Sequence, residues 1–150
     1  MSESPYMQNR HLIYLVDDDA DYRFLVQQVF KMFLPQHQVR FFADGSELAD
    51  AMDLIADENP VKPRVIILDI DMPGLNGFQT LSKLRLHNYW QNVPVLMMTN
   101  RDQAEFRQES LRLGADGFSL KPVDLHQIKA VMTDIYAHEG DFTTFPGLSK

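Results

Sequence analysis

Five short apolar segments recur along the chain, each followed by a more polar stretch. They lie at residues 12–16, 39–42, 65–68, 93–98 and 117–120. Most of them are apolar at nearly every position, which is typical of parallel strands that are covered on both faces. The second segment, Val-Arg-Phe-Phe, contains a charge, so we expect it at an edge of the sheet.

Each apolar segment is followed by a run with apolar residues at helical spacing. The runs lie within residues 22–33, 48–55, 77–87, 102–114 and 124–138. Pro35 stops the first run, Asp44 or Ser46 can cap the second, Gly114 stops the fourth and Asp124 caps the fifth. The pattern predicts one helix after each strand.

A strand and a helix therefore alternate five times, which indicates the fold class. Short connections require right-handed crossovers, so we expect an α/β fold: a (βα)5 doubly wound, parallel five-stranded sheet with helices on both faces. The predicted domain spans residues 11–138. Residues 1–10 form an N-terminal extension, and residues 139–150 form a C-terminal tail without a strand or helix pattern.

Composition narrows the function classes. A chain of 150 residues with 45% hydrophobic residues can bury one ordinary core. Its net charge of -7 argues against direct binding to nucleic acid or to an anionic membrane surface. The absence of cysteine excludes disulfides and thiolate metal sites, and the first apolar run is too short for a signal peptide or a membrane span. We expect a soluble, cytoplasmic protein.

Polar residues with recognisable chemistry follow four of the five expected strands. In an open parallel sheet the ligand crevice lies beyond the carboxyl ends of the strands. The residues at these ends are Asp17, Asp18 and Asp19 after the first strand, Asp69 and Asp71 after the third, Thr99 after the fourth and Lys121 after the fifth. Their joint occurrence on one edge indicates a reactive site.

Three of these acids would repel one another if the first and third strands are neighbours. Asp17, Asp18 and Asp69 would then need to bind protons or a cation. Carboxylates, a backbone carbonyl and waters are ligands that suit Mg²⁺. A carboxylate beside such an ion can attack phosphorus, with Asp69 as the nucleophile, while Lys121 and Thr99 stabilise the charge on the transferring group.

Each residue also has a simpler interpretation. Asp19 is expected to cap the first helix, and by residue type alone Asp17 and Asp18 are as well explained by capping or solvation as by metal binding. Lys121 alone would be a solvated surface lysine, and Thr99 alone would make a local backbone bond. Their concurrence after four strands favours the shared site.

Four stretches together resemble the receiver domain of two-component response regulators, of the single-domain chemotaxis type. They are LVDDDADYR, VIILDIDMPGLNGF, PVLMMTN and GFSLKP, and the resemblance covers about residues 11–138. It implies a flavodoxin-like strand order 2-1-3-4-5, of which a chemotaxis receiver is itself a known example. It also implies that Asp69 accepts phosphate from a sensor histidine kinase or a histidine phosphotransfer protein.

The resemblance also implies roles around the phosphate. Asp18 would bind Mg²⁺ directly, Asp17 through a metal-bound water and Asp71 through its backbone carbonyl, with Asp69 completing the metal site. Thr99 and Lys121 would hold the phosphoryl oxygens. Such a protein is a phosphoprotein of a phosphorelay rather than an enzyme, with at most slow self-dephosphorylation.

In this family the threonine is coupled to an aromatic residue on the fifth strand, here Phe118. Tyrosine is usual there, and phenylalanine lacks its hydroxyl, while Asn100 stands where a small residue is usual. Phosphorylation would remodel the surface of about residues 100–138. A downstream protein or a second copy of the chain would dock there, since nothing after His138 could form a DNA-binding helix-turn-helix domain.

We also predict an ion pair that the resemblance does not supply. Asp71 and Arg101 each follow a site residue by two positions, so their side chains are expected to face each other across the pocket mouth. The pair would impede the water that hydrolyses the acyl phosphate.

Three alternatives remain at this point. The stretch ILDIDMP, residues 67–73, also resembles the motif of haloacid-dehalogenase-type phosphatases, although these usually carry it near the N-terminus. A flavin-binding module of the same architecture lacks support, because no phosphate-binding loop follows the first strand. A degenerate receiver that serves only as a protein scaffold is disfavoured by the complete set of site residues.

Overall fold

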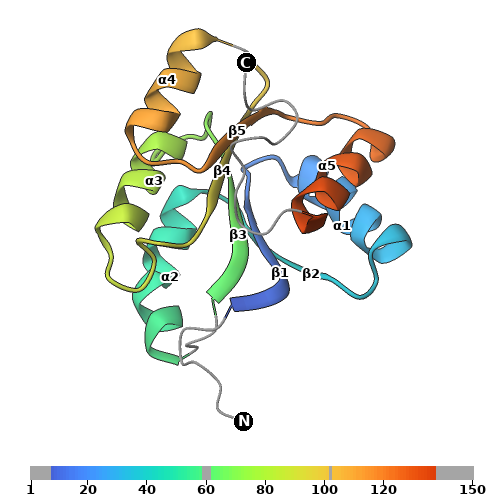
Figure 1. The fold of residues 1–150 in the computed structure, drawn as a ribbon, viewed down its shortest axis with the longest axis horizontal. Coiled ribbons are helices and arrows are strands. Elements are labelled where there is room, and N and C mark those ends of the chain that lie inside the picture. The colour runs from blue at the N-terminus through green and yellow to red at the C-terminus, as the bar shows by residue number, and fades with distance from the viewer. Residues whose placement is uncertain (1–7, 59–61, 102, 138–150) are drawn as a thin grey trace.

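Five strands form one parallel sheet in this computed structural model, which describes residues 8–58, 62–101 and 103–137. The strands are β1 (Gln8–Val16), β2 (Gln38–Phe42), β3 (Lys62–Asp69), β4 (Val95–Thr99) and β5 (Gly117–Leu120). Their order across the sheet is β2-β1-β3-β4-β5, and every pairing is parallel (Figure 1). The predicted fold class and strand order are confirmed.

Helices cover both faces of this sheet. They are α1 (Ala20–Phe33), α2 (Gly45–Glu58), α3 (Gly77–Leu86), α4 (Ala104–Arg112) and α5 (Leu125–Ala137). Helices α1 and α5 pack together on one face, and α2, α3 and α4 lie on the other (Figure 1). None of the helices in the described part of the chain has the length and apolar character needed to cross a lipid bilayer.

Burial along the strands follows their place in the sheet. Seven of the eight residues of β3 and all five residues of β4 are buried, because both strands have neighbours and helices on every side. The edge strand β2 alternates between exposed and half-buried positions before Phe42. The continuous apolar runs and the one interrupted run are therefore explained by position in the sheet.

Side-chain caps fix where α1, α2 and α5 begin. The Asp19 carboxylate accepts hydrogen bonds from the N–H groups of Asp21 and Tyr22 at 2.9 and 3.3 Å. Asp44, rather than Ser46, caps α2, and Asp124 caps α5. Because only three residues separate the end of β1 from the start of α1, the cap also holds these acids at the rim of the sheet.

Strand β1 begins at Gln8, inside the segment predicted as an N-terminal extension. Gln8 and Asn9 pair with Lys62 and Pro63 beyond a shift in register, so backbone pairing extends the strand past its apolar run. The predicted tail, residues 139–150, lies outside the described residues.

Candidate functional site

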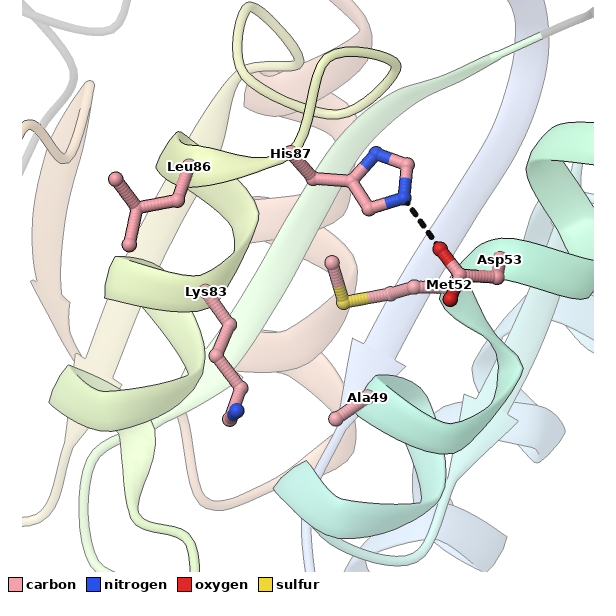
Figure 2. Close-up of a pocket in the computed structure, with 6 residues that line it drawn as sticks. All are labelled: Ala49, Met52, Asp53, Lys83, Leu86 and His87. Carbon is pink, nitrogen blue, oxygen red and sulfur yellow. Dashed lines mark hydrogen bonds and ion pairs between the residues drawn. The ribbon is translucent and has the colours of Figure 1, made fainter.

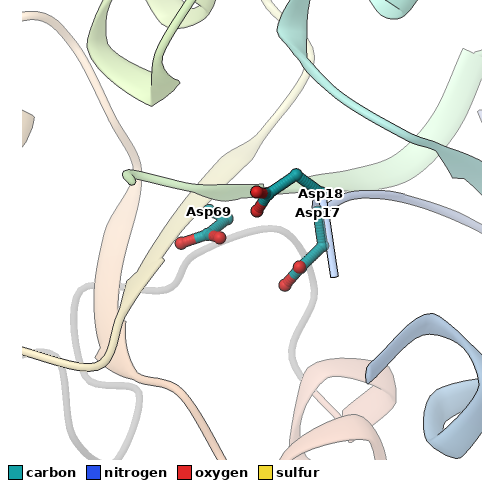
Figure 3. A group of neighbouring side chains, drawn as sticks. All are labelled: Asp17, Asp18 and Asp69. Atoms are coloured by element: carbon teal, nitrogen blue, oxygen red, sulfur yellow. The ribbon is translucent and has the colours of Figure 1, made fainter. Parts of the chain in front are cut away.

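The carboxyl edge of the sheet brings three predicted acids together. Since Val16 of β1 pairs with Leu68 of β3, the residues that follow each strand emerge side by side. One carboxylate oxygen from each of Asp17, Asp18 and Asp69 lies within 4.8 Å of the others (Figure 3). Asp17 and Asp69 are buried and Asp18 is exposed. The cluster is thus open to solvent on one side.

Lys121 reaches this cluster from the end of β5. Its Nζ lies 2.7 Å from Asp17 Oδ2 and 3.8 Å from Asp69 Oδ2, and its side chain is 8% exposed. The Lys121 N–H donates to the Thr99 carbonyl at 2.8 Å, which ties the residue to the end of β4. One ammonium group therefore stands between two buried carboxylates.

Lys121 only partly compensates the negative charge of the acids at this edge, and burial and mutual repulsion disfavour their ionised forms. Burial, together with the charge of Asp17, raises the pKa of Asp69 to about 7 despite the opposing effect of Lys121. Burial likewise raises the pKa of Asp17, and hydrogen bonding to Lys121 opposes this shift. Three hard oxygen donors in one place, with charge left to neutralise, fit a divalent cation such as Mg²⁺.

Thr99, Asp71 and Arg101 form a second group beside the acids. Arg101 Nη2 lies 2.7 Å from Asp71 Oδ1, so the predicted ion pair is confirmed. The Thr99 hydroxyl donates to Asp71 Oδ2 at 3.4 Å and accepts from the Arg101 N–H at 3.1 Å. Both ion-paired side chains are about half exposed. In this structure the Asp71 side chain is therefore turned toward Thr99 and Arg101.

The turn after Asp69 depends on a close backbone approach. A Cβ atom added to Gly77 would lie 2.5 Å from the Asp69 carbonyl oxygen and 2.8 Å from Ile70 Cα. Asn76 caps α3 and forms a capping box with Gln79. Helix α3 can thus begin directly against the end of β3, which fixes the path of the chain past Asp69.

Phe118 occupies the predicted aromatic position on β5. It is 1% exposed and stands beside Met97 of β4 in the sheet register. The Arg107 guanidinium of α4 lies 5.3 Å from the centre of its ring. This contact links α4 to β5. Asn100 lines a hollow near Lys121.

Two residues of α1 belong to the site although the sequence did not single them out. Arg23 Nη1 donates to the Asp17 carbonyl at 2.6 Å, and Lys121 Nζ lies 4.2 Å from the centre of the Tyr22 ring. Sequence periodicity placed Tyr22 only on the apolar face of a helix. The available signal was its place in the first turn of the helix that directly follows the acids and that Asp19 caps.

A separate hollow of about 320 Å³ lies between α2 and α3, away from the acids. It is lined by Ala49, Met52, Asp53, Lys83, Leu86 and His87 (Figure 2). His87 Nε2 and Asp53 Oδ1 are 2.8 Å apart, and the Tyr89 N–H donates to His87 Nδ1 at 3.1 Å. Two helices are thereby joined, and none of the predicted site residues takes part.

Comparison with known families places this geometry in context. Residues 13–133 match the family model described as response regulator receiver domain. Sporulation initiation phosphotransferase F from Bacillus subtilis is 30% identical over 123 residues, which cover 82% of this chain and 90% of that protein. Response regulator MprA from Mycolicibacterium vanbaalenii is 32% identical over 120 residues, which cover 80% of this chain and 48% of MprA.

The chain spans less than half of some other relatives as well. Two-component response regulator ARR7 from Arabidopsis thaliana is 35% identical over 81 residues, 54% of this chain and 39% of ARR7. Among solved structures, the chemotaxis protein CheY4 from Vibrio cholerae has a TM-score of 0.67 at 27% identity, covering 86% of this chain and 98% of CheY4.

Proposed function

The chain belongs to the response regulator receiver domain family, and from this premise we propose that Asp69 is its phosphoacceptor. Receiver domains are phosphoacceptor signalling modules of two-component systems. Asp69 stands at the end of β3, with the carboxylates of Asp17 and Asp18 on one side and the Lys121 ammonium 3.8 Å away. This placement of one carboxylate among acids and a buried cation carries the proposal.

The proposed reaction is transfer of one phosphoryl group. A carboxylate oxygen of Asp69 attacks phosphorus, the bond from phosphorus to the donor's histidine nitrogen breaks, and the bonding electron pair stays on that nitrogen. The product is an acyl phosphate on Asp69. Lys121 is close enough to approach a phosphoryl oxygen after a small movement, and Thr99 offers a hydroxyl donor on the neighbouring strand.

Receiver domains use Mg²⁺ at an acidic pocket, and the residues here fit that ion. We propose that Asp17, Asp18 and Asp69, together with the backbone carbonyl of Asp71, hold it. When bound, Mg²⁺ would neutralise the clustered carboxylates and the charge of an incoming phosphoryl group. Burial and the neighbouring charge of Asp17, which together raise the pKa of Asp69, support this assignment.

Input and output would both be contacts with proteins. The donor would be a sensor histidine kinase or a histidine phosphotransfer protein in the cytoplasm. We propose that phosphorylation shifts the surface formed by α4, β5 and α5 to a conformation that binds a downstream protein or a second copy of the chain. The contact between Arg107 of α4 and Phe118 of β5 lies within this surface. Turnover would be limited to slow self-dephosphorylation.

Incubation with acetyl phosphate and Mg²⁺, followed by intact mass, tests the phosphoacceptor assignment. The parent should gain one phosphoryl group, and Asp69→Asn should gain none. Asp50→Asn, which removes an exposed acid of α2, is the matched control and should behave as the parent. An equal gain in the parent and in Asp69→Asn would refute the proposal.

A further inference from the structure

Tyr22 lies next to Lys121, and none of the roles expected for the site residues explains its presence there. It belongs to the first turn of α1, where its N–H donates to the capping Asp19 carboxylate at 3.3 Å. Its side chain is buried, with 6% of the residue exposed. The Lys121 Nζ lies 4.2 Å from the centre of the Tyr22 ring. The capped start of α1 therefore holds the face of the Tyr22 ring against the Lys121 ammonium.

The Lys121 ammonium is nearly buried, so its position depends on the protein groups that contact it. Its Nζ contacts Asp17 at 2.7 Å, stands 3.8 Å from Asp69 and has the ring at 4.2 Å. An aromatic face attracts a cation, and the attraction grows when the cation is desolvated. The ring thus supplies a third favourable contact for Lys121, in addition to the two carboxylates.

Unlike the ring, the hydroxyl of Tyr22 does not help to hold the Lys121 ammonium in this structure. Tyr22 Oη is buried and has no hydrogen-bond partner among the described residues. A buried hydroxyl without a partner destabilises a fold, and replacing it with hydrogen removes that penalty. The ring and the hydroxyl can therefore be separated by experiment.

We infer that Tyr22 is a positioning residue, whose ring holds the Lys121 ammonium between Asp17 and Asp69 so that it can contact a phosphoryl group on Asp69. The inference rests on the proposed phosphoacceptor function. Without the ring, Lys121 would spend more time away from Asp69, in the adjoining hollow of about 280 Å³ that Tyr22 and Lys121 line. Phosphorylation would then be slower, and the ammonium would be more accessible.

Two substitutions at Tyr22 separate the ring from the hydroxyl. Tyr22→Phe keeps the ring, and Tyr22→Met keeps an apolar side chain without it. We measure the phosphorylation rate by intact mass with acetyl phosphate and Mg²⁺. We measure the labelling of Lys121 with an amine-acylating reagent in the absence of a phosphoryl donor.

Tyr22→Met should be phosphorylated at least about 5-fold more slowly and labelled several-fold faster at Lys121, because the cation–π contact is lost. Tyr22→Phe should stay within about twofold of the parent in both measurements and unfold at an equal or higher denaturant concentration.

Two controls separate positioning from general disruption. Phe33→Met removes the ring that lies 4.5 Å from the Lys129 ammonium, away from the acids, and should leave phosphorylation unchanged. In a Lys121→Gln background, Tyr22→Met should cause no further loss of rate. Tyr22→Leu replaces Tyr22→Met if denaturant unfolding shows that the methionine variant does not fold.

The inference is overturned if Tyr22→Met matches the parent in rate and labelling, or if Tyr22→Phe is as slow as Tyr22→Met. Failure of the phosphoacceptor proposal has a different signature: the parent itself would gain no phosphoryl group. The labelling of Lys121, which needs no donor, would still report whether the ring holds the ammonium.

Discussion

At the scale of single residues, the buried carboxylates determine the chemistry of the site, because one lysine compensates their negative charge only in part. Asp69 is nearly inaccessible to water, close to Asp17, and has only a distant contact with Lys121. The sequence predicted which acids would meet, because residues that follow adjacent parallel strands must emerge together. It did not predict the pairing of Lys121 with Asp17 rather than Asp69, since that choice depends on side-chain conformations that residue spacing does not specify.

The raised pKa of Asp69 predicts how stability depends on pH without metal. The pKa rises from 3.8 to about 7 on folding, so the folded state binds the proton more tightly than the unfolded state. The contribution of Asp69 to stability is therefore fully present below about pH 4 and is lost as the pH rises through about 7. Denaturant unfolding in a chelator should show this loss.

Asp69→Asn should remove most of that dependence. The variant cannot ionise at this position, so at pH 8 without metal it should be more stable than the parent by about 1–3 kcal/mol. Added Mg²⁺ should stabilise the parent more than the variant. If stability rose between pH 5 and 8 in the parent and in the variant alike, the assignment of the raised pKa to Asp69 would be wrong.

The ion pair between Arg101 and Asp71 predicts a longer life for the acyl phosphate. We expect this pair to impede an attacking water, although such an exposed pair stabilises the fold by at most about 1 kcal/mol. Arg101→Ala should therefore lose phosphate several-fold faster after donor removal, at nearly unchanged stability. The control is Arg112→Ala, which removes another exposed ion pair, that between Arg112 Nη2 and Glu109 Oε2 at 2.6 Å. An unchanged lifetime in Arg101→Ala would discard the idea.

At the scale of elements, strand ends and helix starts are what place the chemistry. The sequence predicted the strands from their apolar runs and the caps Asp19 and Asp124 from residue type and position. It could not predict contacts between distant elements. Arg85 of α3, for example, donates to the carbonyls of Gly114, Gln91 and Val93 and pairs with Asp116. Periodicity does not show which polar side chain crosses from one element to another.

The start of α3 gives a prediction at this scale. Gly77→Ala would place a Cβ 2.5 Å from the Asp69 carbonyl oxygen, so α3 or the end of β3 must move. We expect a loss of about 2–4 kcal/mol in the free energy of unfolding and at least tenfold slower phosphorylation, because Asp69 shifts with its backbone. Denaturant unfolding and timed intact mass measure the two effects.

Gly74→Ala is the matched control in the same turn. Gly74 has a φ of +69° and nothing within 4 Å of an added Cβ, so the substitution strains only the local backbone. It should cost about 1 kcal/mol and leave the phosphorylation rate within about twofold of the parent. Equal effects at both glycines would show that contact with Asp69 is not what matters at Gly77.

At the scale of the whole molecule, the strand order explains why residues far apart in sequence share one edge. The order β2-β1-β3-β4-β5 places the ends of β1, β3, β4 and β5 in sequence along the rim, so the acids, Thr99 and Lys121 meet there. Family membership favours a phosphoacceptor over the phosphatase and flavin-binding alternatives. Contacts such as that of His11 with His37, whose Nδ1 atoms are 3.0 Å apart, follow from the fold and have no signature in sequence spacing.

The central claim is that one carboxylate among these acids receives phosphorus, and locating the modification tests it most directly. The protein is phosphorylated with acetyl phosphate and Mg²⁺, the acyl phosphate is reduced with borohydride, and peptides are sequenced by mass spectrometry. The account predicts conversion of the residue at position 69 to homoserine in the parent, and no conversion when Mg²⁺ is chelated. Conversion at Asp17, Asp18 or Asp71 instead, or at no residue, would contradict it.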